Sequence, residues 1–389
     1  MAGTLTVDTI QSDSSYASTL NVASKINFSG GMQIGGQDAT FGGMRNRIIN
    51  GDMRIDQRFV GAATTNAIND FVVDRWVVGQ TTTGKLIAQQ NLNSLTPPPG
   101  FTTYLGVTSQ SAYSIGSSDI FRIYQTLEGY NIADFGWGTA NAITATLSFW
   151  VRSSLTGLFG GAFNNAAGRY PFSYTINSAN TWEYKTITIV GSTTLGAANI
   201  TNGSGISIQF SLGTGTTYSG TAGVWSATNY LSATGTTSVV GTSGATFYVT
   251  GVQLEKGSAA SPFEYRSYGQ ELALCQRYYE KSYDTLTAPG TVTTSGVVYT
   301  TNSSDSAGSL VAHVPFSVPK RTGPTITLYN ANFASTTGTW RYARSGVSET
   351  SYNMVSLYPG TRAFNCYGNT VAAWTPAYQY GHWTADAEL

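Results

Sequence analysis

Residues 251–266, GVQLEKGSAASPFEYR, and residues 267–283, SYGQELALCQRYYEKSY, stand out in a chain that is rich in Gly, Ser and Thr. The first segment predicts the end of a strand, because Val252 and Leu254 alternate and Pro262 cannot donate a ladder hydrogen bond. The same exit carries four charged residues that can form ion pairs: Glu255, Lys256, Glu264 and Arg266. If exposed, such pairs contribute about 0–1 kcal/mol each. We therefore expect a junction between two parts of the chain here.

Residues 267–282 predict the one convincing α-helix of the chain. Ser267 is followed three residues later by Gln270, a spacing typical of a capping box at a helix start. Apolar residues then recur at helical spacing, namely Leu272, Cys275 and Tyr279. A single amphipathic helix between two β regions must bury this stripe. We expect it either to cover an open sheet or to join matching helices of neighbouring subunits.

Residues 44–266 contain short β-branched and aromatic runs separated by turn residues, a pattern typical of an antiparallel sandwich or barrel. The run 143–152, ITATLSFWVR, shows it most clearly, because Ile, Ala, Leu, Phe and Val occupy alternate positions. One face of this strand is expected to meet a core, and the other water or a partner. Residues 283–389 return to strand pattern and predict a second, smaller β-sandwich domain.

Composition excludes several classes of protein. Only 10% of the 389 residues are charged, and the formal net charge is zero. This balance excludes charge-driven disorder. It also provides no net positive charge that would attract nucleic acid or anionic lipid. No apolar run approaches the roughly 18 residues that span a bilayer, and no signal-peptide pattern is present. We expect a protein that is made in a cytoplasm and does not insert into a membrane.

The middle of the chain is unusually poor in charge. Residues 154–254 hold three charged side chains, Arg169, Glu183 and Lys185. A sheet surface of this kind is prone to edge-to-edge pairing unless its edges are covered. Two interpretations are open: either much of this surface lies against sister chains, or it is a Thr- and Ser-rich surface that is merely uncharged.

Residues suited to catalysis do not fall into a recognisable arrangement. His313 and His382 are the only histidines, they lie in different predicted strands, and neither has a nucleophile motif nearby. Cys275 and Cys366 are too few for a disulfide framework or a zinc cluster, and each is expected to be a small buried hydrophobe. Glu128 is interpreted as turn or loop solvation. We predict no metal, no cofactor and no enzymatic activity.

The aromatic residues supply the candidate ligand site. Trp76, in VVDRWVVG, is predicted to anchor the core. Trp150 points away from the apolar face of its strand, so a subunit interface and a sugar platform are both open. Trp137, and Trp225 with Tyr230, lie in Gly- and Ser-rich loops, where a ring either stacks on a sugar or packs the loop locally. The candidate sugar-stacking residues are therefore Trp137, Trp150, Trp225 and Tyr230.

Three segments resemble a known group of proteins. MRNRIINGDMRIDQR (44–58) resembles the opening strand of the β-sandwich in many bacteriophage tail-fibre and related virion proteins. The long segment quoted at the start (251–283) is similar to the one that closes that sandwich, and WTPAYQYGHWTADAEL (374–389) resembles the final strand of their small C-terminal domain. The resemblance implies a jelly-roll sandwich similar to carbohydrate-binding modules, a trimeric fibre and attachment to a virion through the N-terminal segment. Residues 153–245 match no motif.

These observations predict four parts: a virion-anchoring segment in 1–43, a jelly-roll β-sandwich in 44–266, a linking helix in 267–282 and a C-terminal β domain in 283–389. We expect a non-enzymatic component of a bacteriophage virion, a homotrimeric tail or baseplate-attached fibre assembled in the host bacterial cytoplasm. Its expected partners are other tail or baseplate proteins, bound through 1–43, and host surface polysaccharide. The alternatives are a purely architectural head fibre or tail adaptor, and a polysaccharide-depolymerising tailspike enzyme.

Overall fold

Nearly all regular structure in the chain is β-strand. The computed structural model describes residues 33–34, 37–38, 44–65, 69–196, 199–302, 308–333, 337–344, 347–371 and 377–389. Apart from short 3-10 turns, the one helix in this described part is α1 (Tyr268–Gln276). The predicted all-β fold is confirmed. The predicted anchoring segment 1–43 lies outside the described residues, except that β1 (Gln33–Ile34) pairs with β2 (Gln37–Asp38).

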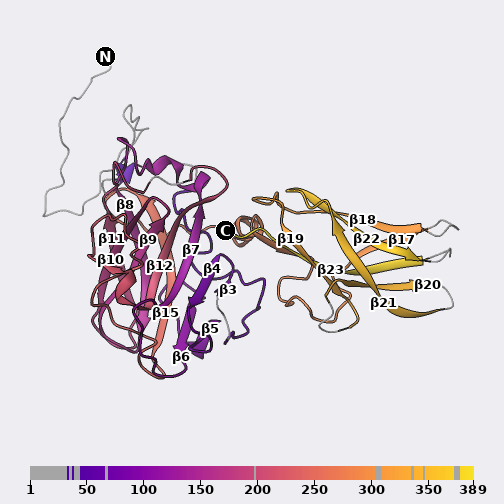
Figure 1. Cartoon of the computed structure of the whole chain (residues 1–389), viewed down its shortest axis with the longest axis horizontal. Helices are drawn as coiled ribbons and strands as arrows, with labels where there is room; N and C mark the ends of the chain where they lie inside the picture. The colour runs from indigo at the N-terminus through magenta and orange to yellow at the C-terminus, as the bar shows by residue number, and fades with distance from the viewer. Residues whose placement is uncertain are drawn as a thin grey trace, which may run out of the picture.

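Two antiparallel sheets pack face to face as a β-sandwich (Figure 1). The six-stranded sheet has the order β10-β9-β12-β7-β4-β3 and consists of β3 (Asn69–Val73), β4 (Trp76–Gln80), β7 (Ile120–Glu128), β9 (Gly157–Asn165), β10 (Gly168–Ile176) and β12 (Ser204–Thr214). The five-stranded sheet has the order β11-β8-β15-β6-β5 and consists of β5 (Leu86–Gln90), β6 (Leu105–Ser109), β8 (Ala145–Ser153), β11 (Glu183–Ile189) and β15 (Thr246–Lys256). The chain crosses repeatedly from one sheet to the other, as it does in a jelly roll.

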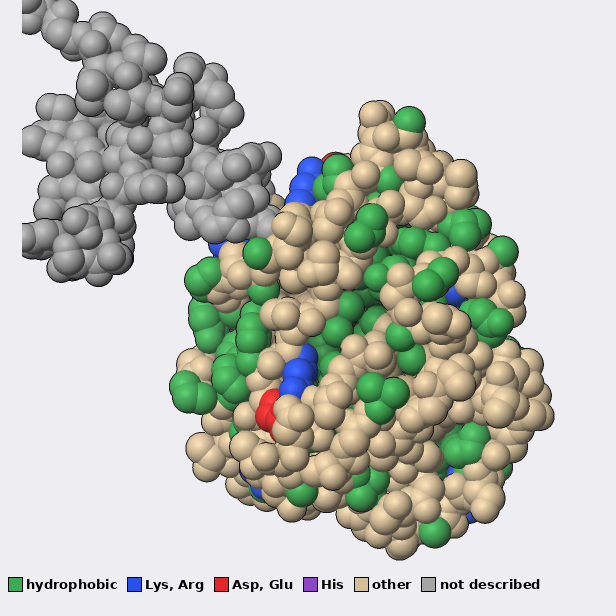
Figure 2. Space-filling view, turned by 90° about the vertical axis from the view of Figure 1, so that its left-hand side faces the viewer, with side chains coloured by type: hydrophobic (Ala, Val, Ile, Leu, Met, Phe, Trp, Pro, Cys, Tyr) green, Lys and Arg blue, Asp and Glu red, His purple; other side chains and the backbone are tan. Residues whose placement is uncertain are grey.

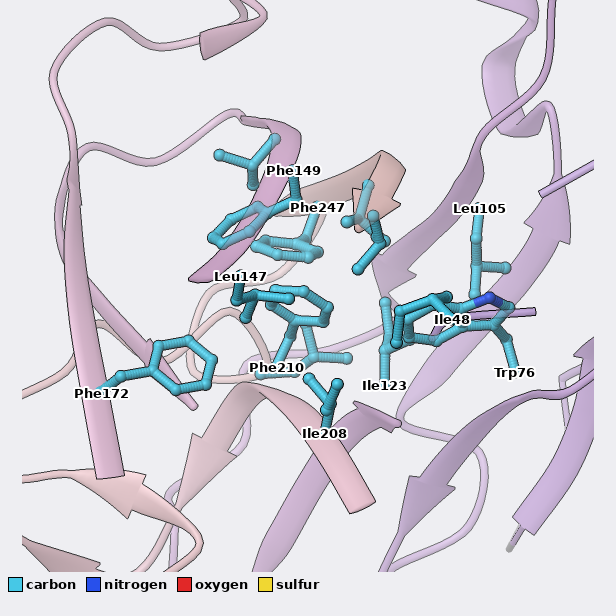
Figure 3. Close-up of a cluster of buried hydrophobic side chains, with 14 of the residues drawn as sticks. Ile48, Trp76, Leu105, Ile123, Leu147, Phe149, Phe172, Ile208, Phe210 and Phe247 are labelled. Carbon is cyan, nitrogen blue, oxygen red and sulfur yellow. The ribbon is translucent and has the colours of Figure 1, made fainter. Parts of the chain in front are cut away.

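Aromatic and aliphatic side chains from both sheets fill the space between them (Figure 3). Phe149 of β8 meets Phe210 of β12 edge to face, with 4.9 Å between ring centroids, and Trp76 of β4 stacks on Phe210 at 6.3 Å. The inward positions of β8 are fully buried: Ala145, Leu147, Phe149 and Val151. The core face predicted for this run is confirmed from Ala145 to Val151, although Thr146 and Ser148 on the opposite face are buried as well. The core position predicted for Trp76 is also confirmed.

Residues 44–58, predicted to be the opening strand of the sandwich, do not form a strand. Instead, the side-chain oxygen of Asn46 accepts hydrogen bonds from the backbone N–H groups of Ile48 and of Leu254 in β15. Asn50 has left-handed backbone (φ 57°) and binds backbone groups within its own turn. Side-chain amides therefore satisfy part of this backbone, and two backbone hydrogen bonds with β15, from Arg47 N–H to the carbonyl of Leu254 and from Val252 N–H to that of Gly51, satisfy another part.

Helix α1 is shorter than the predicted linking helix of 267–282. Ser267 caps the helix as expected, by accepting from the backbone N–H of Gln270, but the helix ends at Gln276. Tyr279–Lys281 form strand β16, which pairs with β23 (Ala377–Asp386). Pairing with β23 gives this backbone partners that a further helical turn would not, and Tyr279 is buried as part of a strand. No helix in the described part of the chain is long and apolar enough to cross a membrane.

Two of the three residues predicted to pack the helix, Leu272 and Cys275, lie in a small apolar cluster within one chain, whereas Tyr279 lies in β16. Cys275 is fully buried and the partly buried Leu272 lies beside it, in contact with the cluster formed by Ile49 and Ile55 of the opening segment. Leu389 also packs against this cluster. The helix therefore covers the opening segment of its own chain, and its contact with neighbouring subunits stays a prediction.

The strands after α1 form a second β structure, at the right in Figure 1. They are β16, β17 (Val298–Asn302), β18 (Gly308–Pro315), β19 (Thr325–Asn330), β20 (Thr339–Arg344), β21 (Val347–Leu357), β22 (Ala363–Val371) and β23. Strand β23 organises this sheet, because β16, β17, β19 and β20 all pair with it. Trp340, Phe364 and Trp383 are buried in its core. Cys366 is buried there and Cys275 at α1, and both are free thiols, as predicted.

Buried ion pairs connect the sandwich to the segments that follow it. Glu128, at the end of β7, is only 1% exposed. Its carboxylate accepts two hydrogen bonds from Arg277, at 2.8 and 2.5 Å, and one from the hydroxyl of Tyr278 at 2.6 Å. The sequence interpretation of Glu128 as turn or loop solvation is therefore wrong. Arg75, which is 2% exposed, pairs in a similar way with Glu388.

Candidate functional site

Two of the predicted sugar-stacking residues pack against each other at one end of the sandwich. Trp137 is 5% exposed, and its indole N–H donates to the carbonyl of Ile143 at 2.7 Å. Trp225 is half-buried, lies edge-on to Trp137 at 5.2 Å between centroids, and donates to the carbonyl of Val190 at 2.7 Å. These two rings cover one end of the hydrophobic core, so Trp137 does not offer an accessible face to a ligand.

Tyr230 lies apart from the other three candidates. Its ring covers Gly220, where a Cβ atom would lie 2.3 Å from the nearest ring atom. The neighbouring Leu231 donates its backbone N–H to the carbonyl of Tyr218 at 2.7 Å. Tyr230 is thus half-buried in the packing of its own loop, and glycine at 220 is what allows the ring to approach.

Trp150 is half-buried, as Trp225 and Tyr230 are, but it lies on the face of a sheet and not in a loop. It occupies the outer face of the five-stranded sheet, because its neighbours Phe149 and Val151 point into the core. On β11 the residue directly opposite is Tyr184, whose ring centroid lies 5.4 Å from that of Trp150 and which is 44% exposed. On β15 the opposite residue is Thr250. The two rings therefore form a cross-strand pair on a surface that is open at one side.

A bulge in β15 brings a loop aromatic beside Trp150. The register shifts after Thr250, and Gly251 has φ +61°. A Cβ atom at Gly251 would lie 2.7 Å from Phe101 and 3.1 Å from Trp150, so both rings lie against this glycine. Any side chain here would be strained by the positive φ and would also push the two rings apart.

Further rings extend this surface on both sides. Phe101 packs on Tyr265, at 5.5 Å between centroids, and Tyr265 is 56% exposed. On the other side Trp182 packs on Tyr248, at 6.3 Å, and donates its indole N–H to the carbonyl of Thr96. We call this surface the aromatic face and define it by its accessible rings: Phe101, Trp150, Trp182, Tyr184 and Tyr265.

The surroundings of the aromatic face are nearly uncharged. Figure 2 looks onto the side of the sandwich where β10 and β11 lie, and it shows hydrophobic side chains scattered among uncharged polar ones, with few charged groups. Of the three charged residues between 154 and 254, Lys185 and Glu183 pair at 2.6 Å. Arg169 binds Asn229 on the other sheet. Arg152, two residues after Trp150 on β8, adds a charged side chain to this outer face. An aromatic surface of this kind, with few charged groups, suits a polar ligand with apolar ring faces.

Two shallow hollows in the described part of the chain lie away from the aromatic face. One shallow hollow of about 440 Å³ lies in the second β structure and is lined by residues that include Ile326, Leu328 and Met354. Another, of about 320 Å³, lies in the sandwich and is lined by residues that include Ile115 and Thr214. Neither hollow is lined by an ionisable side chain. The described residues also contain no group of three His, Cys, Asp or Glu side chains placed to hold a metal ion.

Sequence reasoning missed a serine–histidine pair in the second β structure. Ser282 Oγ lies 2.9 Å from Nδ1 of His382, and Nε2 of His382 lies 3.0 Å from the carbonyl oxygen of Thr293. The proton is therefore assigned to Nε2, and Nδ1 accepts from the hydroxyl. However, His382 is fully buried and stacks on Tyr283, and Ser282 Oγ also accepts the backbone N–H of Trp383. We interpret the pair as structural, because no substrate carbonyl can reach it.

The buried His382 predicts a pH dependence of stability. Desolvation lowers its pKa from the ordinary 6.5. As pH falls below about 6.5, the unfolded chain takes up a proton that the folded state resists, so stability is lost. We expect the free energy of unfolding to decrease between about pH 7.5 and pH 5.5, with at most about 1.4 kcal/mol from this group. Urea titrations should show a weaker pH dependence in H382Q but not in H313Q, where the ring is exposed. Equal pH dependence in H382Q and the natural chain would contradict the assignment.

The residues that sequence reasoning missed on the aromatic face are Phe101, Trp182, Tyr184 and Tyr265. Tyr184 carried one usable signal, because TWEYKTITI alternates and places Tyr184 on the face opposite to Ile187 and Ile189. Nothing local indicates that this strand pairs with β8 in the register that sets Tyr184 beside Trp150. Phe101 and Tyr265 come from loops that meet at the β15 bulge, which periodicity does not reveal.

The fold and this surface define a class: an all-β protein with a jelly-roll sandwich that presents an aromatic platform on one sheet. No protein family and no curated protein matches the chain. Among solved structures, a putative sugar-binding protein from Bacteroides thetaiotaomicron has a TM-score of 0.33 and 10% identity over 55% of this chain and 100% of its own. The carbohydrate-binding module TmCBM61 with β-1,4-galactotriose has a TM-score of 0.28 and 10% identity over 55% and 99%.

A phage protein is also among the similar structures. The enzymatically active domain of bacteriophage CBA120 tailspike protein 4 has a TM-score of 0.32 and 15% identity over 55% of this chain, which spans only 22% of that domain's chain. At these scores the likeness is one of β-sandwich architecture, and it carries no argument about ligand or activity.

Proposed function

We propose that this protein is a non-catalytic carbohydrate-binding component of a bacteriophage particle, and that the aromatic face is its binding surface. The observation that carries the proposal is the row of rings on the outer face of the five-stranded sheet, where Tyr184, Trp150 and Phe101 follow one another across three elements. Aromatic rings of this kind present a flat apolar surface to the C–H faces of sugars, while nearby hydroxyl and amide groups bind sugar hydroxyls.

The open shape of the surface favours binding over catalysis. A glycosidase needs two carboxyl groups placed on either side of the scissile bond. The acids nearest in sequence to the aromatic face are engaged elsewhere: Glu183 binds Lys185, and Glu264 binds Arg266. A depolymerising tailspike is therefore the less favoured candidate for the residues that the structure describes.

The place in a phage particle rests on the sequence resemblance. The segments 44–58 and 251–283 carry it, and they meet where the opening segment lies along the second half of β15, the middle strand of its sheet. We propose a homotrimeric fibre in the phage tail, with residues 1–43 bound to other tail or baseplate proteins. A purely architectural virion role is the second candidate, and the exposed rings favour it too, because a subunit interface would also cover Trp150 and Tyr184.

Replacement of Trp150 tests the function directly. We expect W150A and Y184A each to weaken binding of the intact oligomer to a surface oligosaccharide by about tenfold or more, corresponding to about 1.4 kcal/mol. The matched control is Y130A, which removes a ring of the same sandwich that is 61% exposed but lies outside the aromatic face. Glycan arrays identify the ligand, and titration calorimetry with that glycan measures the loss.

Oligomeric mass separates the two candidates. If light scattering reports a trimer for the natural chain and a smaller mass for W150A, the aromatic face is a subunit interface. If the trimer persists and glycan binding is lost, the face is a ligand site. An intact oligomer that binds no glycan on an array of bacterial surface saccharides would end the carbohydrate proposal.

A further inference from the structure

Arg152 is the arginine of the sandwich that stands without a partner. It lies on β8 two residues after Trp150, so both side chains point to the outer face of the five-stranded sheet. Its Nε is buried and has no hydrogen-bond partner, and the guanidinium makes no hydrogen bond or ion pair to any described residue. The cross-strand neighbour of Arg152 is Tyr248, part of the ring cluster beneath Trp182.

A buried guanidinium nitrogen without a hydrogen-bond partner also occurs in Arg45, Arg47, Arg54, Arg58 and Arg75. The other arginines of the sandwich differ from Arg152 because the rest of the guanidinium group has hydrogen-bond partners. Within the described residues of 44–266, each of them donates at least one hydrogen bond to a carboxylate, amide or carbonyl oxygen: Arg45, Arg47, Arg54, Arg58, Arg75, Arg122, Arg169 and Arg266. A buried guanidinium N–H without an acceptor costs free energy in the absence of a ligand. Arg152 is therefore poised to gain an acceptor from outside the chain.

The nearest acidic residue along the sheet cannot serve as that acceptor. Glu183 is opposite Val151 in the register, so it lies on the other face of β11 from Tyr184. Its carboxylate accepts from Lys185 at 2.6 Å and from the backbone N–H groups of Asn177 and Ser178. These contacts lower the pKa of Glu183, against the effect of burial, which would raise it. The positive charge of Arg152 is thus uncompensated on the aromatic face.

We propose that the aromatic face binds an acidic saccharide, with a sugar ring on Trp150 and its carboxylate on the guanidinium of Arg152. This inference rests on the proposed carbohydrate function and deepens it. Guanidinium and carboxylate match as planar, doubly hydrogen-bonded groups, and such charge-assisted bonds are stronger than neutral ones. A single cation on this surface suits a group of charge −1, such as a uronic acid, better than a phosphate monoester, which would draw on more than one cation.

The test compares saccharides that differ only in the charge of the carboxyl group. The probes are uronic-acid oligosaccharides, such as tetragalacturonate, each paired with its methyl ester, and the protein is the full-length oligomer. We expect at least one acid to bind about tenfold or more tightly than its ester, and this preference to shrink as salt is raised. R152Q should bind acid and ester equally, at the level of the ester, and R152K should keep part of the preference. W150A should weaken both.

Several results separate this inference from the proposed function. The matched control is R169Q, which removes a positive charge from the other sheet and should keep the full preference. If R152Q keeps the preference, or if every ester binds as well as its acid, the Arg152 assignment is wrong while carbohydrate binding stands. If a phosphorylated or sulfated saccharide depends on Arg152 and no uronic acid does, the carboxylate assignment is overturned. If no saccharide binds at all, the proposed function itself fails.

Discussion

Replacing Arg266 by Met should lower the free energy of unfolding of the sandwich by about 3–5 kcal/mol, because it leaves a buried carboxylate without its partner. Arg266 is 9% exposed and Glu271 is 4% exposed. The guanidinium donates to Glu271 at 3.2 Å, to Glu264 at 2.9 Å and to the backbone carbonyl of Ile48 at 3.1 Å. Methionine fills much of the same volume, so the loss reports the polar contacts rather than a cavity.

The two glutamates also hold the opening segment. Glu264 accepts the backbone N–H of Asn46 at 2.8 Å, and Glu271 accepts that of Asn50 at 2.5 Å. Removing Arg266 therefore weakens the attachment of residues 44–55 to β15 and α1 at the same time. This segment has no strand ladder of its own, so we expect its amide hydrogens to exchange faster with solvent in R266M.

Urea denaturation followed by tryptophan fluorescence measures the effect. The control R169M removes a half-buried arginine that makes two exposed hydrogen bonds, to the side chain of Asn229 and to the carbonyl of Ala166, and it should change stability by about 0.5 kcal/mol or less. The double variant R266M/E271Q should recover part of the loss, because it neutralises the orphaned carboxylate. If R266M lowers the free energy of unfolding by less than about 1 kcal/mol, this network of buried charges does not stabilise the sandwich.

The charged cluster at 255–266 illustrates what the sequence could and could not predict. The Ser267 cap was predicted from local chemistry alone and is confirmed, whereas β15 already ends at Lys256, before the Pro262 that was expected to end it. The sequence did not predict how much these ion pairs contribute to stability. We expected them to be exposed, whereas Arg266 and its partner Glu271 are buried beneath the opening segment. Burial of a charge depends on what the chain places over it. Here that cover comes from residues more than 200 positions away.

Periodicity accounts for the elements that were predicted well. On β8 the alternation of small, apolar and polar residues maps directly onto inward and outward faces, and Trp76 lies in an equally clear apolar run. The opening segment failed because Asn46 and Asn50 replace strand pairing with side-chain bonds. The helix prediction ran too long because Tyr279 fits a helical stripe and a strand equally well, and only β23 decides between them.

Of the residues that define the aromatic face, one, Trp150, was predicted from the sequence. Trp150 was identified because a large ring on the polar face of a strand is a departure from the pattern. Trp137 and Trp225 occupy the kind of loop in which rings bind sugars, but they close the core instead. Arg152 carried no signal, because an arginine on an outer strand position is ordinary until the absence of its partner is seen.

Replacing Glu388 by Ala should lower the free energy of unfolding by about 3–5 kcal/mol, because Arg75 then lies buried without its hydrogen-bonded carboxylate. Arg75 is 2% exposed, and burial lowers its pKa. Its Nη1 donates to Glu388, its Nη2 donates to the carbonyl of Thr126, and its guanidinium lies 3.6 Å from the ring centroid of Tyr278. The carbonyl and the ring remain in the variant, but neither neutralises the charge.

The loss should appear at the contact between the sandwich and the second β structure. Glu388 is the second residue after β23, and its neighbour Ala387 donates its backbone N–H to the carbonyl of Tyr278. We therefore expect calorimetry of E388A to separate one transition into two, as the two parts cease to unfold together.

D386N is the control, since Asp386 binds Arg58 with a side chain that is 43% exposed and should contribute about 1 kcal/mol or less. The double variant R75M/E388M should regain most of the stability, because an apolar pair of similar volume removes the buried charge together with its partner. A single unchanged transition in E388A would show that the contact between the two parts does not depend on this ion pair.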